Sequence, residues 1–376
     1  MTADLAVATA TPFSYLDTPT AAPLSISELM PGAYNLMEYA AVTAGEQVLV
    51  LTEHGTDPVV VQAISAAAAY RNADVHVLSV PSFSAGGWDR ATPSPLLPAA
   101  HDAVDVVISL TWWGEVHTAG LFFDGIAKRR ARFVSLHQTA TAAAMATGPR
   151  FPLELYFALE ARATALIAAA SEIKVTTALG TDVTFRDLAT SGHHAPLAPG
   201  MWRPFPYGGV NFYPDRTDGV VVIEESTVTG VPAGRTTVEL ADNRVTAIDG
   251  SAAAAELRRY APTGYYLRHA LIGLNPKVRL AGGSQFEREK HAGAFYFGLD
   301  ALTADGMVDR GGPGHAHCDC QFDRPTITID GAPFVDDGHL LLLDDPDIRE
   351  LAGKFGPADV LLDPNPRLVL PSRYSR

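Results

Sequence analysis

The chain has 376 residues, of which 47% are hydrophobic and 19% are charged, and its formal net charge is −14. This length suits two domains with sizeable cores, and the composition is typical of a globular protein rather than a disordered one. Nucleic acids and anionic membrane surfaces attract basic proteins, so an excess of 42 acidic over 28 basic residues argues against both as partners.

Two cysteines, Cys318 and Cys320, are the whole cysteine content of the chain and lie two positions apart. A disulfide between such close residues would be strained, so we expect both thiols to be reduced. The first residues lack a basic segment followed by an apolar run, and no later apolar run is long enough to span a bilayer. These features predict a cytoplasmic protein with neither a signal peptide nor a membrane span.

The N-terminal part of the chain alternates between strand and helix patterns. The segment 46–55, EQVLVLTEHG, is typical of a buried strand that ends at a glycine, and 57–73 is typical of a helix. A second strand is expected over 73–81, and the strand–helix–strand pattern then repeats. We therefore predict that residues 1–150 form an α/β domain of doubly wound type, with a parallel sheet and flanking helices.

Polar and aromatic side chains follow the predicted strands of this domain. His54 follows the first strand, the segment from Trp112 to His117 follows the third, and His137 follows the fourth. Ligands bind at the carboxyl edge of such parallel sheets, so we expect this edge to face a ligand.

Beyond a helix expected over 153–170, the pattern becomes rich in short alternating strands that turn on glycine or aspartate. The segment 174–187, KVTTALGTDVTFRD, is typical of a hairpin with Gly180 in its turn. Further alternating stretches follow, and the last begins at residue 324. We predict that residues 151–376 form an α+β domain that is rich in antiparallel sheet and carries the metal site discussed next.

The segment 311–323, GGPGHAHCDCQFD, gathers five potential metal ligands within six positions. If it is extended, alternation places His315, His317 and Asp319 on one face and both cysteines on the other. Because free cysteine behaves as a small apolar residue, we interpret the cysteines as part of the core. Imidazole together with carboxylate suits Fe(II), Mn(II) or Zn(II).

Local sequence leaves two interpretations of this segment open. Histidine and aspartate beside a glycine-rich turn also occur where they serve turn formation alone. A mononuclear metal site would need at least one more ligand from elsewhere in the chain, and local sequence does not choose among the candidates. These are His269, Glu289, His291, His193 and His194.

A series of motifs resembles a known superfamily. In chain order they are LGTDVTFRD (179–187), PYGGVNFYP (206–214), LRHALIGLNP (267–276), EREKHAGAFYFGLD (287–300) and HCDCQFDRPTITIDGAPFVDDG (317–338). In this order they resemble the aminopeptidase T-like metallopeptidases and their relatives, the 2,5-dihydroxypyridine 5,6-dioxygenases. The N-terminal half is similar to this superfamily only in its layout.

The two branches of the superfamily differ at positions that hold metal. Where the peptidases carry a glutamate before their G-x-N-P motif, this chain has His269. Where they carry a second glutamate and a histidine, it has Gly209 and Tyr296, whereas the H-x-D pair, His317 and Asp319, is kept. The resemblance to the dioxygenase branch implies a metal site of His269, His317 and Asp319, which has the composition of the facial triad of non-haem Fe(II) oxygenases.

The resemblance implies an Fe(II)-dependent dioxygenase that opens the ring of 2,5-dihydroxypyridine, or of a close hydroxypyridine, between carbons 5 and 6 to give N-formylmaleamate. Its partners would be a small aromatic N-heterocycle and O₂, and an acidic enzyme of this kind is expected to be a homo-oligomer. A metallo-aminopeptidase and a metal-binding relative without catalytic activity are the alternatives.

Further side chains are expected around the metal. His117 and His193 are candidates for proton transfer, because a histidine titrates near neutral pH. His315 shares a face with the triad pair and is expected to orient a ligand or the substrate. Tyr296 takes the place of a peptidase ligand, so we expect its hydroxyl to bond substrate or oxygen. The substrate-binding candidates are Trp112, Trp113 and His194, and ordinary packing or a solvated loop is the alternative for all of these residues.

Overall fold

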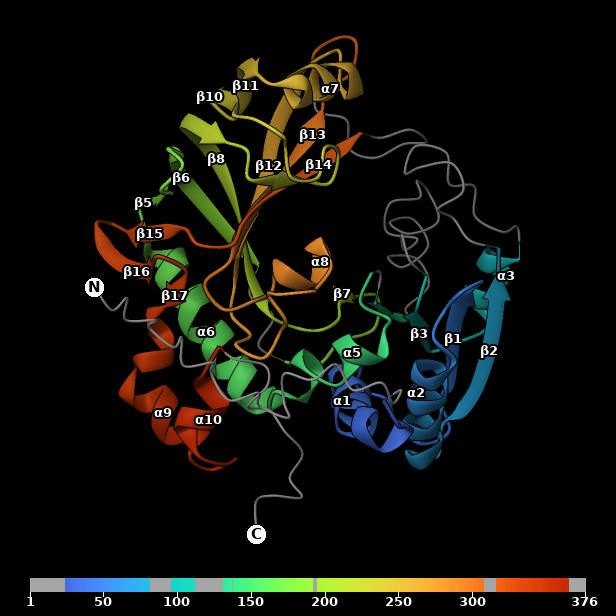
Figure 1. The fold of residues 1–376 in the computed structure, drawn as a ribbon. Helices are drawn as coiled ribbons and strands as arrows, with labels where there is room; N and C mark the ends of the chain where they lie inside the picture. The colour runs from blue at the N-terminus through green and yellow to red at the C-terminus, as the bar shows by residue number, and fades with distance from the viewer. Residues whose placement is uncertain are drawn as a thin grey trace, which may run out of the picture.

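The computed structural model describes residues 24–81, 96–111, 131–136, 138–191, 195–307 and 316–364 of the chain. Two β-sheets organise these residues, one parallel and one antiparallel, with helices packed around them (Figure 1). This confirms the predicted combination of a parallel sheet with flanking helices and a second part rich in antiparallel sheet.

The first sheet contains five parallel strands in the order β2-β1-β3-β4-β7. Every residue of β1 after Gln47 is buried. A parallel strand with neighbours on both sides and helices against its faces has no exposed side, which explains the apolar run VLVL at residues 48–51. The strands are β1 (Gln47–Glu53), β2 (Asp74–Val80), β3 (Val106–Ser109), β4 (Arg132–Ser135) and β7 (Trp202–Pro204).

The sequence at the start of helix α2 explains why this helix begins at Pro58. Pro58 occupies its first turn, and the side chain of Asp57 accepts a hydrogen bond from the backbone N–H of Val59. Both features are favoured at a helix start, where backbone N–H groups lack partners within the helix. The elements here are α1 (Ile26–Tyr39), α2 (Pro58–Tyr70), α3 (Leu97–Asp102), α5 (Ala142–Met145) and the short helix η4 (Gly148–Arg150).

The chain returns to the first sheet after it has entered the second part. Helix α6 (Leu153–Ala169) confirms the helix predicted over 153–170. Strand β7 comes later in the sequence than α6, yet it pairs with β4 as the fifth parallel strand. The predicted division into domains at residue 150 stays a prediction.

The second sheet contains twelve strands, and its long strand β8 pairs with β6, β10 and β12. β8 spans 14 residues, and on one side its second half pairs with β10 while its first half pairs with β12. Strands β12, β13 and β14 therefore form an antiparallel group beside the first half of β8 (Figure 1). The hairpin predicted around Gly180 is confirmed as β5 and β6, and this glycine has a positive φ of 103°.

The order across this sheet is β17-β16-β15-β5-β6-β8-β10-β11-β12-β13-β14-β9. Its strands are β5 (Glu172–Thr176), β6 (Asp182–Ser191), β8 (Gly209–Val222), β9 (Glu225–Ser226), β10 (Thr236–Ala241), β11 (Arg244–Gly250), β12 (Tyr265–Gly273), β13 (Phe295–Ala301), β14 (His317–Phe322), β15 (Thr326–Ile329), β16 (Ala332–Asp336) and β17 (His339–Leu340). The remaining helices are α7 (Ala252–Tyr260), α8 (Gln285–Arg288), η5 (Leu341–Asp344), α9 (Pro346–Ala352) and α10 (Ala358–Leu362).

Aromatic packing makes one face of β12–β14 a core face. The ring of Phe295 lies 5.7 Å from that of Phe185 and 5.8 Å from that of Phe322, measured between centroids, and all three side chains are fully buried. Such pairs add to the free energy gained by burying apolar surface. Because successive side chains of a strand point to opposite faces, the other face of these strands is left for polar groups.

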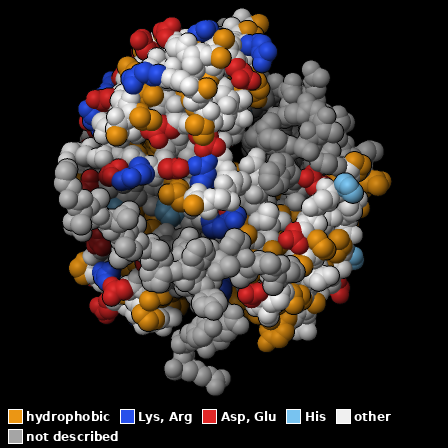
Figure 2. All heavy atoms as spheres, viewed as in Figure 1, with side chains coloured by type: hydrophobic (Ala, Val, Ile, Leu, Met, Phe, Trp, Pro, Cys, Tyr) orange, Lys and Arg blue, Asp and Glu red, His pale blue; other side chains and the backbone are white. Residues whose placement is uncertain are grey.

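The surface and the helices add two observations. Within the described ranges, no helix combines the length and the apolar character needed to cross a membrane. On the face shown in Figure 2, acidic and basic side chains are interspersed over the coloured surface.

Asn275 joins the two parts of the structure. It is fully buried, and its Nδ2 donates hydrogen bonds to the backbone oxygens of Gly148 and Tyr207, at 3.1 and 2.9 Å. Its Oδ1 accepts a bond from the backbone N–H of Lys277 at 2.9 Å. One side chain thus forms three hydrogen bonds to backbone groups, although the oxygen of Gly148 also accepts one from the backbone N–H of Phe151.

Asn275→Ala is therefore expected to lower the free energy of unfolding by about 2–4 kcal/mol, because it removes all three of these buried hydrogen bonds. Denaturant unfolding followed by circular dichroism measures the change. Gln62→Ala, at an exposed position of α2, serves as the control and should change stability by less than about 0.5 kcal/mol. Equal stability losses in the two variants would contradict this role for Asn275.

Candidate metal centre

Strand β14 separates the polar and apolar members of the 311–323 cluster. Cys318 and Cys320 are fully buried among the core residues, whereas the side chains of His317 and Asp319 retain 12% and 13% of their exposure on the opposite face. This confirms the predicted alternation, and it follows from the packing of the cysteine face against the phenylalanine core.

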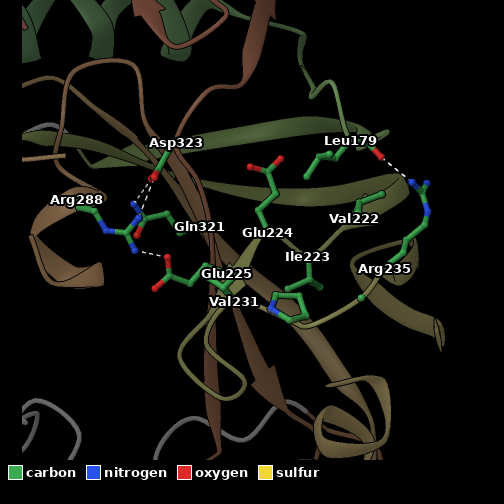
Figure 3. A pocket seen from close by; sticks show the side chains of 12 residues that line it. Leu179, Val222, Ile223, Glu224, Glu225, Val231, Arg235, Arg288, Gln321 and Asp323 are labelled. Atoms are coloured by element: carbon green, nitrogen blue, oxygen red, sulfur yellow. Dashed lines mark hydrogen bonds and ion pairs between the residues drawn. The ribbon is translucent and has the colours of Figure 1, made fainter. Parts of the chain in front are cut away.

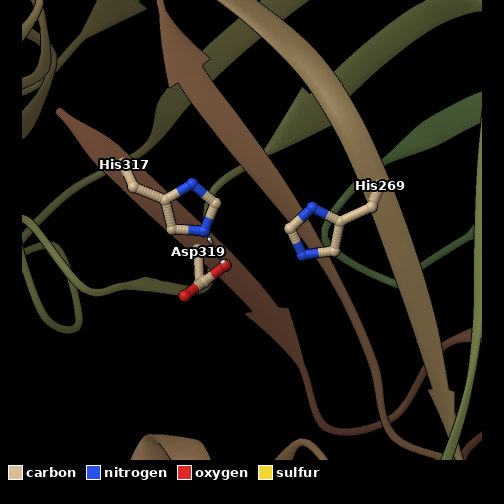
Figure 4. A group of neighbouring side chains, drawn as sticks. All are labelled: His269, His317 and Asp319. Atoms are coloured by element: carbon tan, nitrogen blue, oxygen red, sulfur yellow. Dashed lines mark hydrogen bonds and ion pairs between the residues drawn. The ribbon is translucent and has the colours of Figure 1, made fainter. Parts of the chain in front are cut away.

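His269 joins this polar face from strand β12. One ligand atom from each of His269, His317 and Asp319 lies within 4.8 Å of the other two (Figure 4). The two imidazole rings are parallel to within 2°, with centroids 5.6 Å apart. Among the described residues, this is the group of three such side chains that could share a metal ion.

A β-bulge turns His269 toward the site. Strand β12 faces its core with Tyr265 and Leu267 but continues with Ala270 and Ile272, so the buried positions change from odd to even. The pairing with β13 shifts between Leu267 and His269, which leaves one extra residue in β12. A bulge of this kind re-aims the side chains that follow it. Without it, alternation would send His269 to the core face.

Gly298 of β13 forms the floor between the two imidazoles. It pairs with His269 on one side and with Asp319 on the other. A Cβ atom at this position would lie 2.5 Å from Cε1 of His269 and 2.7 Å from Cε1 of His317, closer than real Cβ contacts. Both rings therefore occupy space that any side chain at residue 298 would need.

Asp300, which lies on β13 like Gly298, orients the ring of His317 on β14. The Nδ1–H of His317 donates a hydrogen bond to Oδ1 of Asp300 at 2.6 Å, and Arg268 donates to its Oδ2 at 3.2 Å. This leaves Nε2 of His317 to face Asp319, whose Oδ1 is 3.0 Å away. A carboxylate behind a histidine in this way fixes the ring and makes the other nitrogen a better ligand.

The two histidines have opposite electrostatic environments. Burial lowers the pKa of His269 to about 4, so this ring is neutral at physiological pH, the form that binds metal. Burial also acts to lower the pKa of His317, but the carboxylates of Asp319 and Asp300 outweigh it and raise that pKa well above its usual value. A bound cation would compete with the proton on Nε2 of His317.

Tyr296 lies against His269, close to the predicted metal ligands. Its hydroxyl is 3.2 Å from Nε2 of His269, and the two rings meet edge to face at 83°. Burial, together with the carboxylates of Glu289 and Asp319, raises the pKa of Tyr296 well above its usual value. The phenol is therefore protonated and can donate a hydrogen bond at neutral pH.

The two rival ligands have other partners. Glu289 accepts an ion-paired hydrogen bond from Lys290 at 2.6 Å, and burial raises its pKa to about 7. His291 donates from Nδ1 to the backbone oxygen of Val278 at 2.8 Å. Neither side chain belongs to the group around His269.

Two cavities lie away from the triad. One of about 470 Å³ is lined by Glu224, Asp323 and Arg288, and Arg288 forms ion pairs with Asp323 and Glu225 there (Figure 3). Another of about 350 Å³ lies at the carboxyl ends of β1 and β2, the edge of the parallel sheet that was expected to face a ligand. No triad residue lines either cavity.

Several residues predicted for the site lie outside the described residues, so their roles stay predictions. These are Trp112, Trp113, His117, His137, His193, His194 and His315. Conversely, the sequence analysis missed Gly298 and Asp300, although both stand in the quoted segment 287–300. Their alternation with Tyr296 was the available signal, since residues 296, 298 and 300 share one face of β13.

The chain is similar to known proteins in sequence and in fold. Residues 29–342 match the NicX family model, described as 2,5-dihydroxypyridine 5,6-dioxygenase. A solved 2,5-dihydroxypyridine dioxygenase from Pseudomonas putida KT2440 has a similar fold, with a TM-score of 0.65 and 19% identity, over 87% of this chain and 99% of that one. AmpT from Thermus thermophilus is more distant, with a TM-score of 0.55 and 11% identity, over 84% of this chain and 100% of that one.

No curated protein sequence matches the chain. The family match nevertheless spans most of the sequence and includes every residue of the candidate metal centre. The two solved structures share the overall fold of this chain. The chain belongs to the 2,5-dihydroxypyridine 5,6-dioxygenase family and is a ring-cleaving dioxygenase.

Proposed function

We propose that His269, His317 and Asp319 bind one Fe(II) ion, and that the enzyme opens 2,5-dihydroxypyridine between carbons 5 and 6 to give N-formylmaleamate. The observation that carries the proposal is that one ligand atom of each residue lies within 4.8 Å of the other two, although His269 and His317 are 48 positions apart in the sequence. Two imidazoles and one carboxylate form the donor set of mononuclear non-haem Fe(II) oxygenases, which leaves positions open for other molecules.

The donor set suits a divalent cation in other respects. His269 is neutral, His317 is held in one tautomer by Asp300, and Asp319 supplies the negative charge. Fe(II) bound there would supply an electronic path between the ring and O₂ and a template that holds the two together.

The surrounding residues hold and protect this centre. Thr227 accepts a hydrogen bond from the backbone N–H of Asp319, and Gln285 donates one to its backbone oxygen. The residue that follows β9 and the first residue of helix α8 therefore both fix this part of β14. The protonated Tyr296 is placed to donate a hydrogen bond to an oxygen atom of the substrate or of O₂ beside His269. In the proposal His117 or His193 moves the hydroxyl proton of the substrate, Trp112, Trp113 and His194 help to hold the ring, and His315 orients a ligand.

Two observations argue against the peptidase alternative. The peptidase ligand positions at 209 and 296 carry glycine and tyrosine, which leaves a second metal ion without its ligands. A side chain at Gly209 would in addition meet Cδ1 of Leu271 at 2.5 Å. In a relative without catalytic activity, at least one of the three candidate ligands, or Asp300 as the partner of His317, would be expected to have been replaced. The cytoplasmic location and the homo-oligomeric state stay predictions.

The central experiment measures metal content and oxygen uptake. Protein purified without oxygen, loaded with Fe(II) and given 2,5-dihydroxypyridine should bind one iron per chain and consume one O₂ per ring opened. His317→Ala and Asp319→Ala should each lose the iron and the oxygen uptake, because each removes one of three ligands. His339→Ala, at a half-exposed histidine paired with Asp344, is the matched control. Two metal ions per chain, or full activity in either ligand variant, would sink the proposal.

Asp300→Asn tests the partner of His317. Loss of the carboxylate charge should weaken Fe(II) affinity by roughly tenfold to a hundredfold, because the ring of His317 loses both its orientation and its electron donation. Competition with a chelator measures the affinity. Asp336→Asn, at an exposed aspartate of strand β16, should leave it unchanged. An unaltered affinity in Asp300→Asn would show that the carboxylate is not needed.

Gly298→Ala tests the floor of the site. The added methyl group must push His269 and His317 apart, so Fe(II) affinity should fall at least tenfold, on the order of what loss of a supporting residue costs. Folding should be kept, since Gly298 has no positive φ that alanine would strain. Gly234→Ala, where the new Cβ meets only Ser251 at 3.3 Å, is the control. Wild-type affinity in Gly298→Ala would refute this account of the spacing.

A further inference from the structure

The candidate metal ligands belong to a row of side chains that crosses the antiparallel sheet. Asp319 of β14 stands opposite Gly298 of β13, and Gly298 stands opposite His269 of β12. The register of β12 with β8 makes Tyr213 the next residue of the row, and Tyr213 in turn stands opposite Ala189 of β6. Directly opposed residues of antiparallel strands point to the same face and contact one another. The row therefore continues from the metal ligands to Tyr213.

The geometry of Tyr213 agrees with this register. Its ring centroid lies 6.4 Å from that of His269, and the two planes are tilted by 42°. The hydroxyl of Ser191, at the end of β6, lies 3.5 Å from the phenol oxygen of Tyr213. The tyrosine thus stands beside the ligand imidazole, on the side away from Gly298, and is held at its far end.

Tyr213 differs from its neighbours in exposure. It is 40% exposed, whereas Phe212 before it is fully buried and Tyr296, on the other side of His269, is 8% exposed. Its partner Ala189 is exposed and small, so it does not cover the ring from the β6 side. An aromatic ring left open next to a polar site offers a flat apolar surface to a ligand.

We propose that Tyr213 forms the wall against which the hydroxypyridine ring stacks while its oxygen atoms face the metal ligands. This inference rests on the proposed function, because it assigns a binding surface for that substrate. A planar aromatic substrate needs contact with its ring face as well as with its polar edge, and an offset or tilted tyrosine ring provides it. Tyr213 is then a specificity residue for flat aromatic rings and holds no metal.

The alternative role for Tyr213 is to support His269 by packing, and two substitutions separate the roles. Tyr213→Leu removes the aromatic face, so the KM for 2,5-dihydroxypyridine should rise by roughly threefold to tenfold, with kcat changed much less. The Kd for the substrate, measured without oxygen by its absorbance change on the Fe(II)-loaded protein, should rise in parallel. Tyr213→Phe keeps the face and should stay within about twofold of the wild type.

Fe(II) affinity and a matched variant complete the test. Tyr213→Leu should retain wild-type Fe(II) affinity in chelator competition, and Tyr70→Leu, at a 75% exposed tyrosine that packs against Tyr34, should change nothing. An unchanged substrate Kd in Tyr213→Leu, a Tyr213→Phe variant as weak as Tyr213→Leu, or a loss of Fe(II) affinity would each overturn the inference. Failure of the proposed function would appear differently, as a wild-type protein that consumes no oxygen with this substrate.

Discussion

The site depends on one constraint, that two imidazoles from strands on either side of β13 must share the space above a single backbone position. Gly298 leaves that space free, and the bulge before His269 turns the second imidazole into it. Neither feature would be enough alone. Without the bulge the histidine would face the phenylalanine core, and with a side chain at residue 298 the two rings could not stand parallel 5.6 Å apart.

The bulge has a second effect, because it places the consecutive residues Arg268 and His269 near the same face of the sheet. Arg268, the extra residue, donates a hydrogen bond to Asp300, while His269 joins the ligand group. Asp300 in turn holds the ring of His317. The half-exposed side chain of Arg268 therefore contacts the buried carboxylate of Asp300, which in turn contacts the candidate metal ligand His317. Strand β13 supplies no ligand, yet its residues 296, 298 and 300 contact or border both histidines.

The buried side of the same strands explains why the polar side can be so specialised. Cys318, Cys320 and the phenylalanines of β13 and β14 are fully buried in one core, and this one-sided burial fixes the register of β12, β13 and β14. A slip of one residue would exchange every core side chain with a site side chain. The stability of the fold and the geometry of the site are therefore set by the same pairing.

Local sequence was enough to predict the buried parallel strand β1, the hairpin at Gly180, and the opposite faces taken by the His317–Asp319 pair and the two cysteines. These follow from local periodicity, which one segment contains completely. The motifs also indicated the family, which the family match confirms, and they predicted a triad of metal ligands that stays a prediction. The fold was needed to show that His269 faces the other two candidate ligands, and that Gly298 and Asp300 border them. Those facts depend on a bulge and on contacts between strands distant in sequence, and the pattern of a single strand does not contain its partner.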